Sequence, residues 1–240
     1  MEKFQYALQE DELLQDVGIS LENPRHLFRY HSSEEAQSVS WGYAFVKRCM
    51  DVIGSLFAIA LASVPMLVIA LAIFLHDHHT PFFCQERVTE NGRHFKMYKF
   101  RTMCVDAEQK LEQLKQQNEA DGPVFKMKND PRITKIGKFL RKTSLDELPQ
   151  FFNVLGGSMS LVGPRPPLPR EVEQYTPYQQ KRLSTKGGIT CYWQCSGRSN
   201  IMFDEWVELD LKYIRERSVT TDVKILLKTV SAVLRRDGAE

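Results

Sequence analysis

The sequence carries almost no excess of charge of either sign. Its 32 lysine and arginine residues are balanced by 30 acidic residues, so the formal net charge of the 240-residue chain is +2. Domains that bind nucleic acid usually show a strong basic excess on one face. The balance therefore argues against a nucleic-acid partner, and the basic residues have to be interpreted by where they cluster.

Cysteine is scarce and follows no pairing pattern. The five cysteines are odd in number and widely spread along the chain. Because no signal peptide precedes them, we expect free thiols in a reducing compartment. Cys191 and Cys195 have no histidine or further cysteine nearby, so no zinc site is expected there.

Long uncharged runs are also lacking, with one exception. Residues 52–75 contain no charged side chain, and they exceed the length of about 20 apolar residues that a helix needs to cross a bilayer. The run begins well inside the chain, unlike a cleavable signal peptide. A buried core helix is the alternative interpretation. We expect a membrane-associated segment over residues 41–79.

The middle and the flanks of this run suggest how it meets the membrane. Ser63 and Pro65 fall near its centre, and a proline inside a helix removes a hydrogen bond and kinks the helix. Lys47 and Arg48 mark the N-terminal side as cytoplasmic. The C-terminal side leads into a basic remainder that must also be cytoplasmic if it uses a nucleotide. We therefore predict a re-entrant helix-break-helix with its break at Ser63 and Pro65, with a simple span as the alternative.

The remaining patterns predict an α+β fold that is mainly helical. Residues 1–40 are polar and are expected to form an N-terminal extension. Residues 80–240 are expected to form one compact cytoplasmic domain. Amphipathic patterns predict helices over residues 106–118, 133–142 and 203–234, and the second of these could lie on the membrane surface.

A small β-hairpin is expected near the start of that domain. Asn91-Gly92 separates two strand-like runs, and this dipeptide is a strong hairpin signal. Lys96, Lys99 and Arg101 in the second run do not all share one face. At least one of them is therefore expected to point into a site.

Asp146 and Glu147 are adjacent carboxylates in a basic setting. Arg165 follows them between two prolines, and cations precede them. Because nearby cations favour an ionised carboxylate, we expect lowered pKa values for the pair. An ionised nucleophile or metal ligand beside an anion-binding surface suits phosphoryl transfer. The preceding basic residues are Lys135, Lys138, Arg141 and Lys142.

A structural interpretation of the same pair stands beside the catalytic one. Ser144 and Glu147 fit a capping box, and acidic residues favour a helix N-terminus. The helix would then end at Gly156-Gly157. The two interpretations are compatible, because free N–H groups at a helix N-terminus also stabilise a phosphoryl group.

Other residues suit phosphates or a nucleotide. The guanidinium of Arg141 can hold phosphate oxygens in a fork. Prolines on both sides of Arg165 limit its backbone freedom, which lowers the entropy lost when its side chain is presented. Residues 186–198 combine glycines, aromatic rings, an amide and cations, a mixture that suits a base and its phosphates. A solvated surface and an ordinary proline-rich loop are the alternatives.

Several segments, found in a fixed order, resemble one known family. Together they cover roughly residues 45–235, and the combined pattern is far more specific than any single piece. These segments are Lys47-Arg48 with Asp51, 98–103 with 106–108, 130–134, 141–153, 159–166 and 188–198. They resemble the bacterial sugar transferase family, the monotopic polyprenyl-phosphate hexose-1-phosphate transferases.

The resemblance implies a two-step transferase. The nucleophile of the family corresponds to Asp146, which would attack the sugar-bearing phosphorus of a UDP-sugar and expel UMP, and polyprenyl phosphate would then accept the sugar phosphate. Glu147 would assist as a metal or proton partner, and Mg²⁺ bound by this pair would neutralise the diphosphate. The other implied site residues are Arg141, Arg165, Lys99 and Arg101 for substrate phosphates, and Gln194, Arg198 and Thr190 for the nucleotide.

The resemblance also implies a place of action. It favours the minimal form of the family, without the four transmembrane helices found upstream in larger relatives, at the cytoplasmic face of a bacterial inner membrane. The bilayer is then a partner, and a homodimer is left open. Departures at Ser158 and at residues 187–191 leave the sugar open. The alternative is a non-catalytic membrane-anchored scaffold with a phosphate-binding basic surface, which should tolerate Asp146→Asn.

Overall fold

The structure, a computed structural model, describes residues 40–119, 122–125, 127, 129–195 and 202–235. These described residues all belong to one compact unit. The expected extension over residues 1–40 lies outside the described residues, apart from Ser40.

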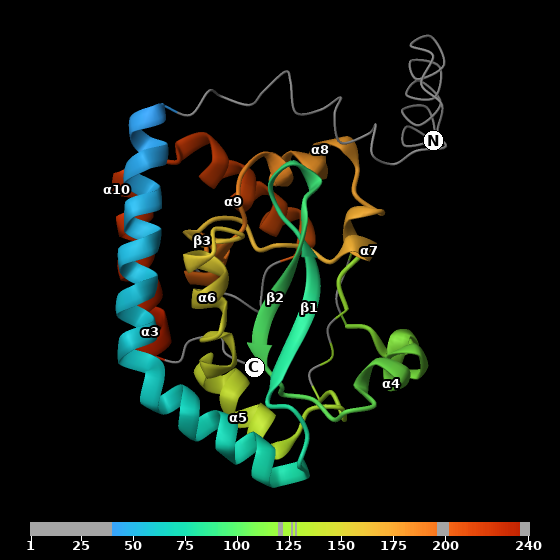
Figure 1. Ribbon diagram of the computed structural model, residues 1–240. Helices are drawn as coiled ribbons and strands as arrows, with labels where there is room; N and C mark the ends of the chain where they lie inside the picture. The colour runs from blue at the N-terminus through green and yellow to red at the C-terminus, as the bar shows by residue number, and fades with distance from the viewer. Residues whose placement is uncertain (1–39, 120–121, 126, 128, 196–201, 236–240) are drawn as a thin grey trace, which may run out of the picture. The chain divides into compact units, whose positions relative to one another are not determined.

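The described part of the chain is mainly helical, with two small sheets (Figure 1), which confirms the predicted fold class. Its helices and strands are α3 (Trp41–Asp77), β1 (Phe82–Val88), β2 (His94–Phe100), α4 (Ala107–Leu114), α5 (Lys135–Thr143), α6 (Gln150–Leu155), β3 (Ser160–Val162), α7 (Pro169–Val172), α8 (Pro177–Gln180), β4 (Gly188–Thr190), α9 (Phe203–Glu216) and α10 (Val219–Arg235).

The predicted hairpin is confirmed. Strands β1 and β2 pair antiparallel from Phe82–Phe100 to Val88–His94. The turn works because Asn91 and Gly92 adopt left-handed backbone conformations, with φ of 57° and 71°. The second strand ends at Phe100, and Met103 instead forms an isolated bridge with Ile133.

A parallel pair of strands, β3 and β4, was not predicted. Ser160 lies opposite Gly188 and Val162 opposite Thr190. The two backbones approach so closely that a Cβ atom on Gly188 would lie 2.2 Å from the Gly163 nitrogen. Only glycine fits there, and the close approach brings the segment after β3, which carries Arg165, next to the segment before β4.

The N-terminal part of α3 is attached to the rest of the domain by charged side chains. Asp51 Oδ1 accepts hydrogen bonds from Ser160 Oγ and the Leu161 amide, at 2.9 and 2.8 Å. Lys47 Nζ donates to the Val162 carbonyl and pairs with Asp222 at 2.8 Å. Lys47 therefore serves as a contact of the domain as well as a flank of the apolar run.

The described helix α3 continues without interruption through Ser63 and Pro65. Figure 1 shows it bent rather than broken. A proline removes one hydrogen bond and its ring clashes with the preceding turn, which bends a helix without ending it when the flanking residues favour helix. The predicted break is therefore a bend within a single 37-residue helix.

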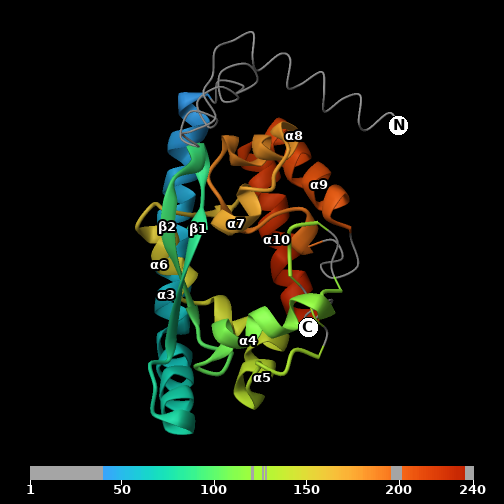
Figure 2. The same cartoon turned by 90° about the vertical axis from the view of Figure 1, so that its right-hand side faces the viewer.

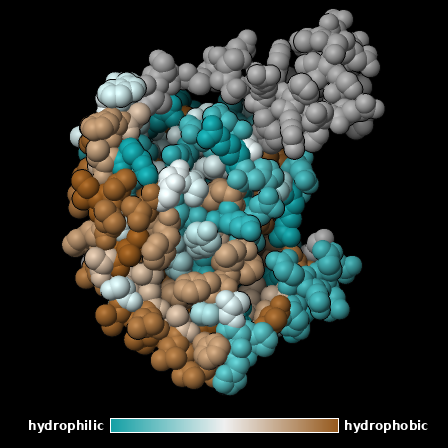
Figure 3. All heavy atoms as spheres, in the orientation of Figure 1, coloured by the Kyte–Doolittle hydropathy of each residue, from teal (hydrophilic) through white to brown (hydrophobic). Residues whose placement is uncertain are grey.

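Apolar side chains cover the outer surface of α3. Figure 3 shows the hydrophobic surface along this helix, on the outside of its bend. Among the described helices, α3 alone is long and apolar enough to cross a membrane. The exposed apolar residues on it include Ile53, Leu56, Phe57, Leu61, Val64, Leu67, Val68, Leu71, Phe74 and Leu75.

The main core joins the hairpin, the parallel strands and the last two helices. Met97 of β2, Val162 of β3, Tyr213 of α9 and Ile225 of α10 are all buried in it. Figure 2 shows the hairpin and α3 on one side and α9 and α10 on the other, with α4 and α5 at the lower end. This arrangement places residues from distant parts of the chain around one cavity.

Candidate active site

Asp146 and Glu147 lie in a short 3-10 turn between α5 and α6. The predicted capping box is wrong. Ser144 adopts a left-handed conformation with φ of 56° and ends α5, and its amide donates to carbonyls of that helix. Helix α6 begins only at Gln150 and ends, as predicted, at Gly156. The acidic pair therefore lies at a junction between two helices.

An open cavity of about 980 Å³ contains most of the predicted site residues. Its walls come from β1, β2, the acidic turn, the segment after β3, and α10. Arg198 lies outside the described residues. The predicted residues that line the cavity are Lys99, Arg101, Arg141, Asp146, Glu147, Arg165, Thr190 and Gln194.

Lys99 reaches the acidic turn from β2. Its Nζ atom lies 2.9 Å from Glu147 Oε1. Asn153 holds α6, which follows the acidic turn, against β2. Its side chain accepts from the Tyr98 amide at 2.9 Å and donates to the Lys96 carbonyl at 2.8 Å. The contact between Lys99 and the acidic turn therefore depends on a buried amide that contacts neither charge.

The predicted lowering of the Asp146 pKa is wrong. Burial raises the pKa of this carboxyl above its ordinary value, and the neighbouring Glu147 raises it further. Lys99 and Arg141 oppose this shift without cancelling it. Asp146 is 8% exposed, so the loss of hydration outweighs the nearby positive charge.

Arg141 and Arg101 have different surroundings. Arg141 Nε donates to Thr102 Oγ1 at 3.0 Å, and the guanidinium lies near enough to Asp146 to affect its pKa. Arg101 instead forms a two-pronged ion pair with Asp77 at the end of α3, at 2.5 and 2.7 Å. Its predicted role with phosphate stays a prediction, because this guanidinium anchors the end of α3.

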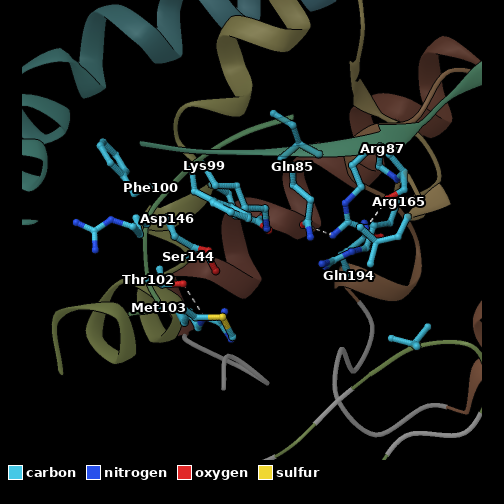
Figure 4. Close-up of a pocket in the computed structure, with 18 of the residues that line it drawn as sticks. Gln85, Arg87, Lys99, Phe100, Thr102, Met103, Ser144, Asp146, Arg165 and Gln194 are labelled. Atoms are coloured by element: carbon cyan, nitrogen blue, oxygen red, sulfur yellow. Dashed lines mark hydrogen bonds and ion pairs between the residues drawn. The ribbon is translucent and has the colours of Figure 1, made fainter. Parts of the chain in front are cut away.

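The residues predicted to bind the nucleotide differ in where they lie. Gln194 and Arg165 lie together at one end of the cavity in Figure 4. Thr190 is buried in β4, and its hydroxyl lies 2.7 Å from that of Thr229. Thr190 thus connects β4 with α10 at the cavity wall.

Two cavity residues on β1 were missed by the sequence analysis. Gln85 and Arg87 both line the cavity, and Figure 4 shows them on the same strand beside Arg165. Arg87 donates to Gln85 Oε1 and to the Pro166 carbonyl, both at 2.9 Å. Their separation by two residues in a strand places both on one face, and this signal could have identified them.

The acidic turn can supply part of a magnesium site. No cluster of three or more histidine, cysteine, aspartate or glutamate residues suited to a metal ion is found among the described residues. Mg²⁺ is commonly held by one or two carboxylates together with substrate phosphates. Asp146 and Glu147 fit that donor set, with the remaining ligands coming from the substrate and water.

Curated relatives resemble most of this chain. A galactosyl transferase, CpsE, from Streptococcus agalactiae is 49% identical over 206 residues, which are 83% of this chain and 44% of the relative. An undecaprenyl-phosphate galactose phosphotransferase from Salmonella typhimurium is 41% identical over 81% of this chain and 42% of the relative. The chain therefore spans less than half the length of these relatives.

A shorter relative matches along most of its length. The exopolysaccharide production protein ExoY of Rhizobium meliloti is 36% identical over 86% of this chain and 93% of the relative. The family model described as bacterial sugar transferase matches residues 42–236, which include α3, the acidic turn and every described wall of the cavity. The chain belongs to the bacterial sugar transferase family.

Proposed function

We propose that this protein transfers a hexose-1-phosphate from a UDP-sugar to polyprenyl phosphate, with undecaprenyl phosphate as the acceptor. The observation that carries the proposal is the burial of Asp146 in a cavity lined by Lys99, Arg141 and Arg165. A buried carboxylate among cations suits attack on a phosphate. The product would begin the assembly of an exopolysaccharide or another glycoconjugate.

In the first step, a carboxylate oxygen of Asp146 attacks the sugar-bearing phosphorus of the UDP-sugar. A bond forms between this oxygen and the phosphorus, and the bond from the phosphorus to the bridging oxygen breaks. The bridging oxygen keeps the electron pair and leaves as part of UMP. A sugar-phosphoryl-aspartate remains, and Lys99 and Arg141 lie close enough to Asp146 to stabilise the charge on its phosphate.

In the second step, an oxygen of polyprenyl phosphate attacks the same phosphorus. The bond between Asp146 and the phosphorus breaks, so the carboxylate is restored and polyprenyl-diphospho-sugar is released. The attacking phosphate is already an anion, so the step requires no general base. The positive wall of the cavity accommodates this second anionic substrate after UMP has left.

Asp146 and Glu147 would hold Mg²⁺ together with the substrate diphosphate. When bound, the ion neutralises negative charge on the phosphates and polarises them towards attack. Lys99 pairs with Glu147 at 2.9 Å. That contact keeps the second carboxylate oriented beside the first.

We further infer that α3 enters the membrane and returns to the same side. Its N-terminal part is held by the contacts of Lys47 and Asp51, and its C-terminal end by the ion pair of Asp77 with Arg101. Both ends are therefore attached to one domain, which cannot lie on two sides of a bilayer. The bend near Pro65 and the apolar surface outside it fit this path (Figures 1 and 3).

Cysteine accessibility tests this path. Single cysteines at Ser40 and Thr80, in a variant lacking the native thiols, should both react with an impermeant reagent only from the cytoplasmic face of inner-membrane vesicles. Labelling from opposite faces would contradict re-entry.

UMP release tests the reaction. Purified protein should release UMP in the presence of Mg²⁺, undecaprenyl phosphate and one member of a panel of UDP-sugars. UDP-galactose is the first to test, because two relatives are named for galactose. Asp146→Asn should abolish release. If neither the wild type nor the variant releases a nucleotide from any nucleotide sugar, the alternative of a non-catalytic membrane-anchored scaffold would be favoured.

A further inference from the structure

Arg87 is a buried cation that the proposed reaction does not yet use. Its side chain lines the cavity and is 6% exposed. One terminal nitrogen donates to the Pro166 carbonyl and the other to Gln85 Oε1, whereas Nε is buried without a hydrogen-bond partner. The ion pairs found in the described part of the chain do not include this arginine.

A second cation increases the electrostatic cost of this arrangement. Burial and the neighbouring Arg165 lower the pKa of Arg87 to about 10, although Glu171 and Glu147 act in the opposite direction without forming an ion pair with it. A buried charge without a paired counter-charge is unfavourable, and a like charge nearby makes it more so. Two guanidinium groups held together in this way are stabilised when an anion binds between them.

The strand register separates Arg87 from the acidic turn. Lys99 lies opposite Phe83, and Arg87 follows four residues later on the same face of β1, about 13 Å along the strand. Figure 4 shows Lys99 and Asp146 at one end, Arg87, Arg165 and Gln194 at the other, and Gln85 between them. The cavity therefore has one set of positive groups beside the acidic turn and a second further along β1, and Arg165 of the second lies close enough to affect the pKa of Arg141 in the first.

We propose that Arg87 and Arg165, with Gln85 orienting the Arg87 guanidinium, bind the phosphate that leaves with the nucleoside. Lys99 and Arg141 would serve the phosphate that Asp146 retains. The assignment rests on the proposed function, because only a diphosphate donor delivers two adjacent phosphates with different fates. The ligand of the Arg87 subsite is thus the phosphomonoester of UMP once the bond has broken.

A structural role for Arg87 is the competing explanation. Its contact with the Pro166 carbonyl helps to attach the end of β1 to the segment that carries Arg165. Thr89 makes a comparable attachment, since its hydroxyl accepts from the Gly187 amide at 3.0 Å. Thr89→Ala weakens the attachment of the end of β1 to the segment before β4, which lies next to the segment that carries Arg165, and it removes no cation, so it is the matched control.

Titration calorimetry with purified wild type, Arg87→Gln, Arg87→Lys and Thr89→Ala tests the proposal. UMP, uridine and inorganic phosphate are the probes. Wild type should bind UMP more tightly than uridine. Arg87→Gln should weaken UMP binding at least about 10-fold and leave uridine unchanged, since a charge-assisted phosphate contact is lost. The UMP affinity of Arg87→Lys should lie between those of wild type and Arg87→Gln, and the UMP affinity of Thr89→Ala should equal that of wild type.

A second arm separates the two phosphate sources. Polyprenyl phosphate also carries a phosphomonoester, so farnesyl phosphate serves as a short acceptor probe. Arg87→Gln should bind it as wild type does. Unchanged UMP binding, a loss confined to farnesyl phosphate, or an equal UMP loss in Thr89→Ala would each overturn the assignment.

Failure of this proposal can be distinguished from failure of the proposed function. The protein could bind phosphate in a way that depends on Arg87 and yet release no UMP from any UDP-sugar. That result would support the anion site and contradict the transferase function. If Arg87→Gln does not fold, Gln85→Ala replaces it, because it removes the orienting acceptor and keeps the cation. A UMP affinity equal to wild type in Gln85→Ala would then overturn the proposal.

Discussion

Lys99 Nζ lies 2.9 Å from Glu147 Oε1, a contact between residues 48 positions apart in the sequence. Lys99 also lowers the pKa of the adjacent Asp146, against the larger effect of burial. One ammonium group from β2 thus acts on both carboxylates of the turn. The ionisation of Asp146, the proposed nucleophile, therefore depends on the pairing of the hairpin with this turn.

Replacing Lys99 should therefore change the pH dependence of the reaction. The raised pKa of Asp146 means that the ionised form of this proposed nucleophile is lost as the pH falls through that pKa. Lys99→Met removes a cation that lowers this pKa, so the acid limb of kcat should move to higher pH and activity at neutral pH should fall at least about 10-fold. Lys96→Met, on the exposed face of β2, is the control. An unmoved acid limb in Lys99→Met would contradict the role given to Lys99.

Asp146→Asn should separate activity from stability. If Asp146 is the nucleophile, as proposed, its loss should reduce UMP release at least about 1,000-fold. The folded pKa is raised, so the stability contributed by this group is present at low pH and lost as the pH rises through that pKa. The variant should therefore be more stable than wild type at pH 8, with a smaller difference at pH 5.

Thermal unfolding at both pH values measures the stability difference. Asp204→Asn is the control. This exposed carboxylate lies in the first turn of α9, so its loss should lower stability slightly and by the same amount at both pH values. A variant Asp146→Asn that is less stable than wild type at pH 8 would show that the carboxylate is well paired in the fold.

Asn153→Ala should weaken both the fold and the site. Asn153 is 4% exposed and joins α6 to the backbone of β2 at Tyr98 and Lys96. Its removal leaves a partly buried amide and a partly buried carbonyl of β2 without this partner, so the free energy of unfolding should fall by about 2 kcal/mol. Urea unfolding checks this value. Ser158→Ala removes the longer contacts of Ser158 Oγ with the Asn153 side chain, at 3.3 Å, and with the Asn153 carbonyl, at 3.2 Å, and leaves both bonds to β2 in place, so it should cost much less.

Lys47→Met should act on the attachment of α3 rather than on headgroup binding. Lys47 pairs with Asp222, whose side chain is 1% exposed. Leaving that carboxylate buried and unpaired should lower the free energy of unfolding by about 3 kcal/mol. Binding to anionic vesicles should stay at the wild-type level. The opposite pattern, unchanged stability with weaker vesicle binding, would restore Lys47 to a purely flanking role.

Local sequence patterns predicted which secondary-structure elements form better than they predicted which side chains become buried. Asn91-Gly92 indicated the hairpin because its backbone preference is a property of two neighbouring residues. The burial of Asp146 depends on α5, α6 and β2 closing around it, and the sequence near residue 146 shows only the cations. The raised pKa was missed for that reason.

The same contrast applies to the basic residues. Arg141 and Arg165 were identified by their neighbours in sequence, and both line the cavity. The partner of Arg101 is Asp77, which lies 24 positions away and became adjacent only when α3 packed beside the hairpin. Arg87 was missed because its place in the cavity depends on the strand face that it shares with Gln85.

The most direct test of the central claim is the intact mass of the protein after incubation with a UDP-sugar and Mg²⁺ in the absence of polyprenyl phosphate. We expect a gain in mass equal to one hexosyl phosphate, the release of one UMP per protein, and loss of the adduct when undecaprenyl phosphate is added. Asp146→Asn should show no gain. UMP release by wild type without any adduct, at the shortest times and with acceptor absent, would contradict a covalent role for Asp146.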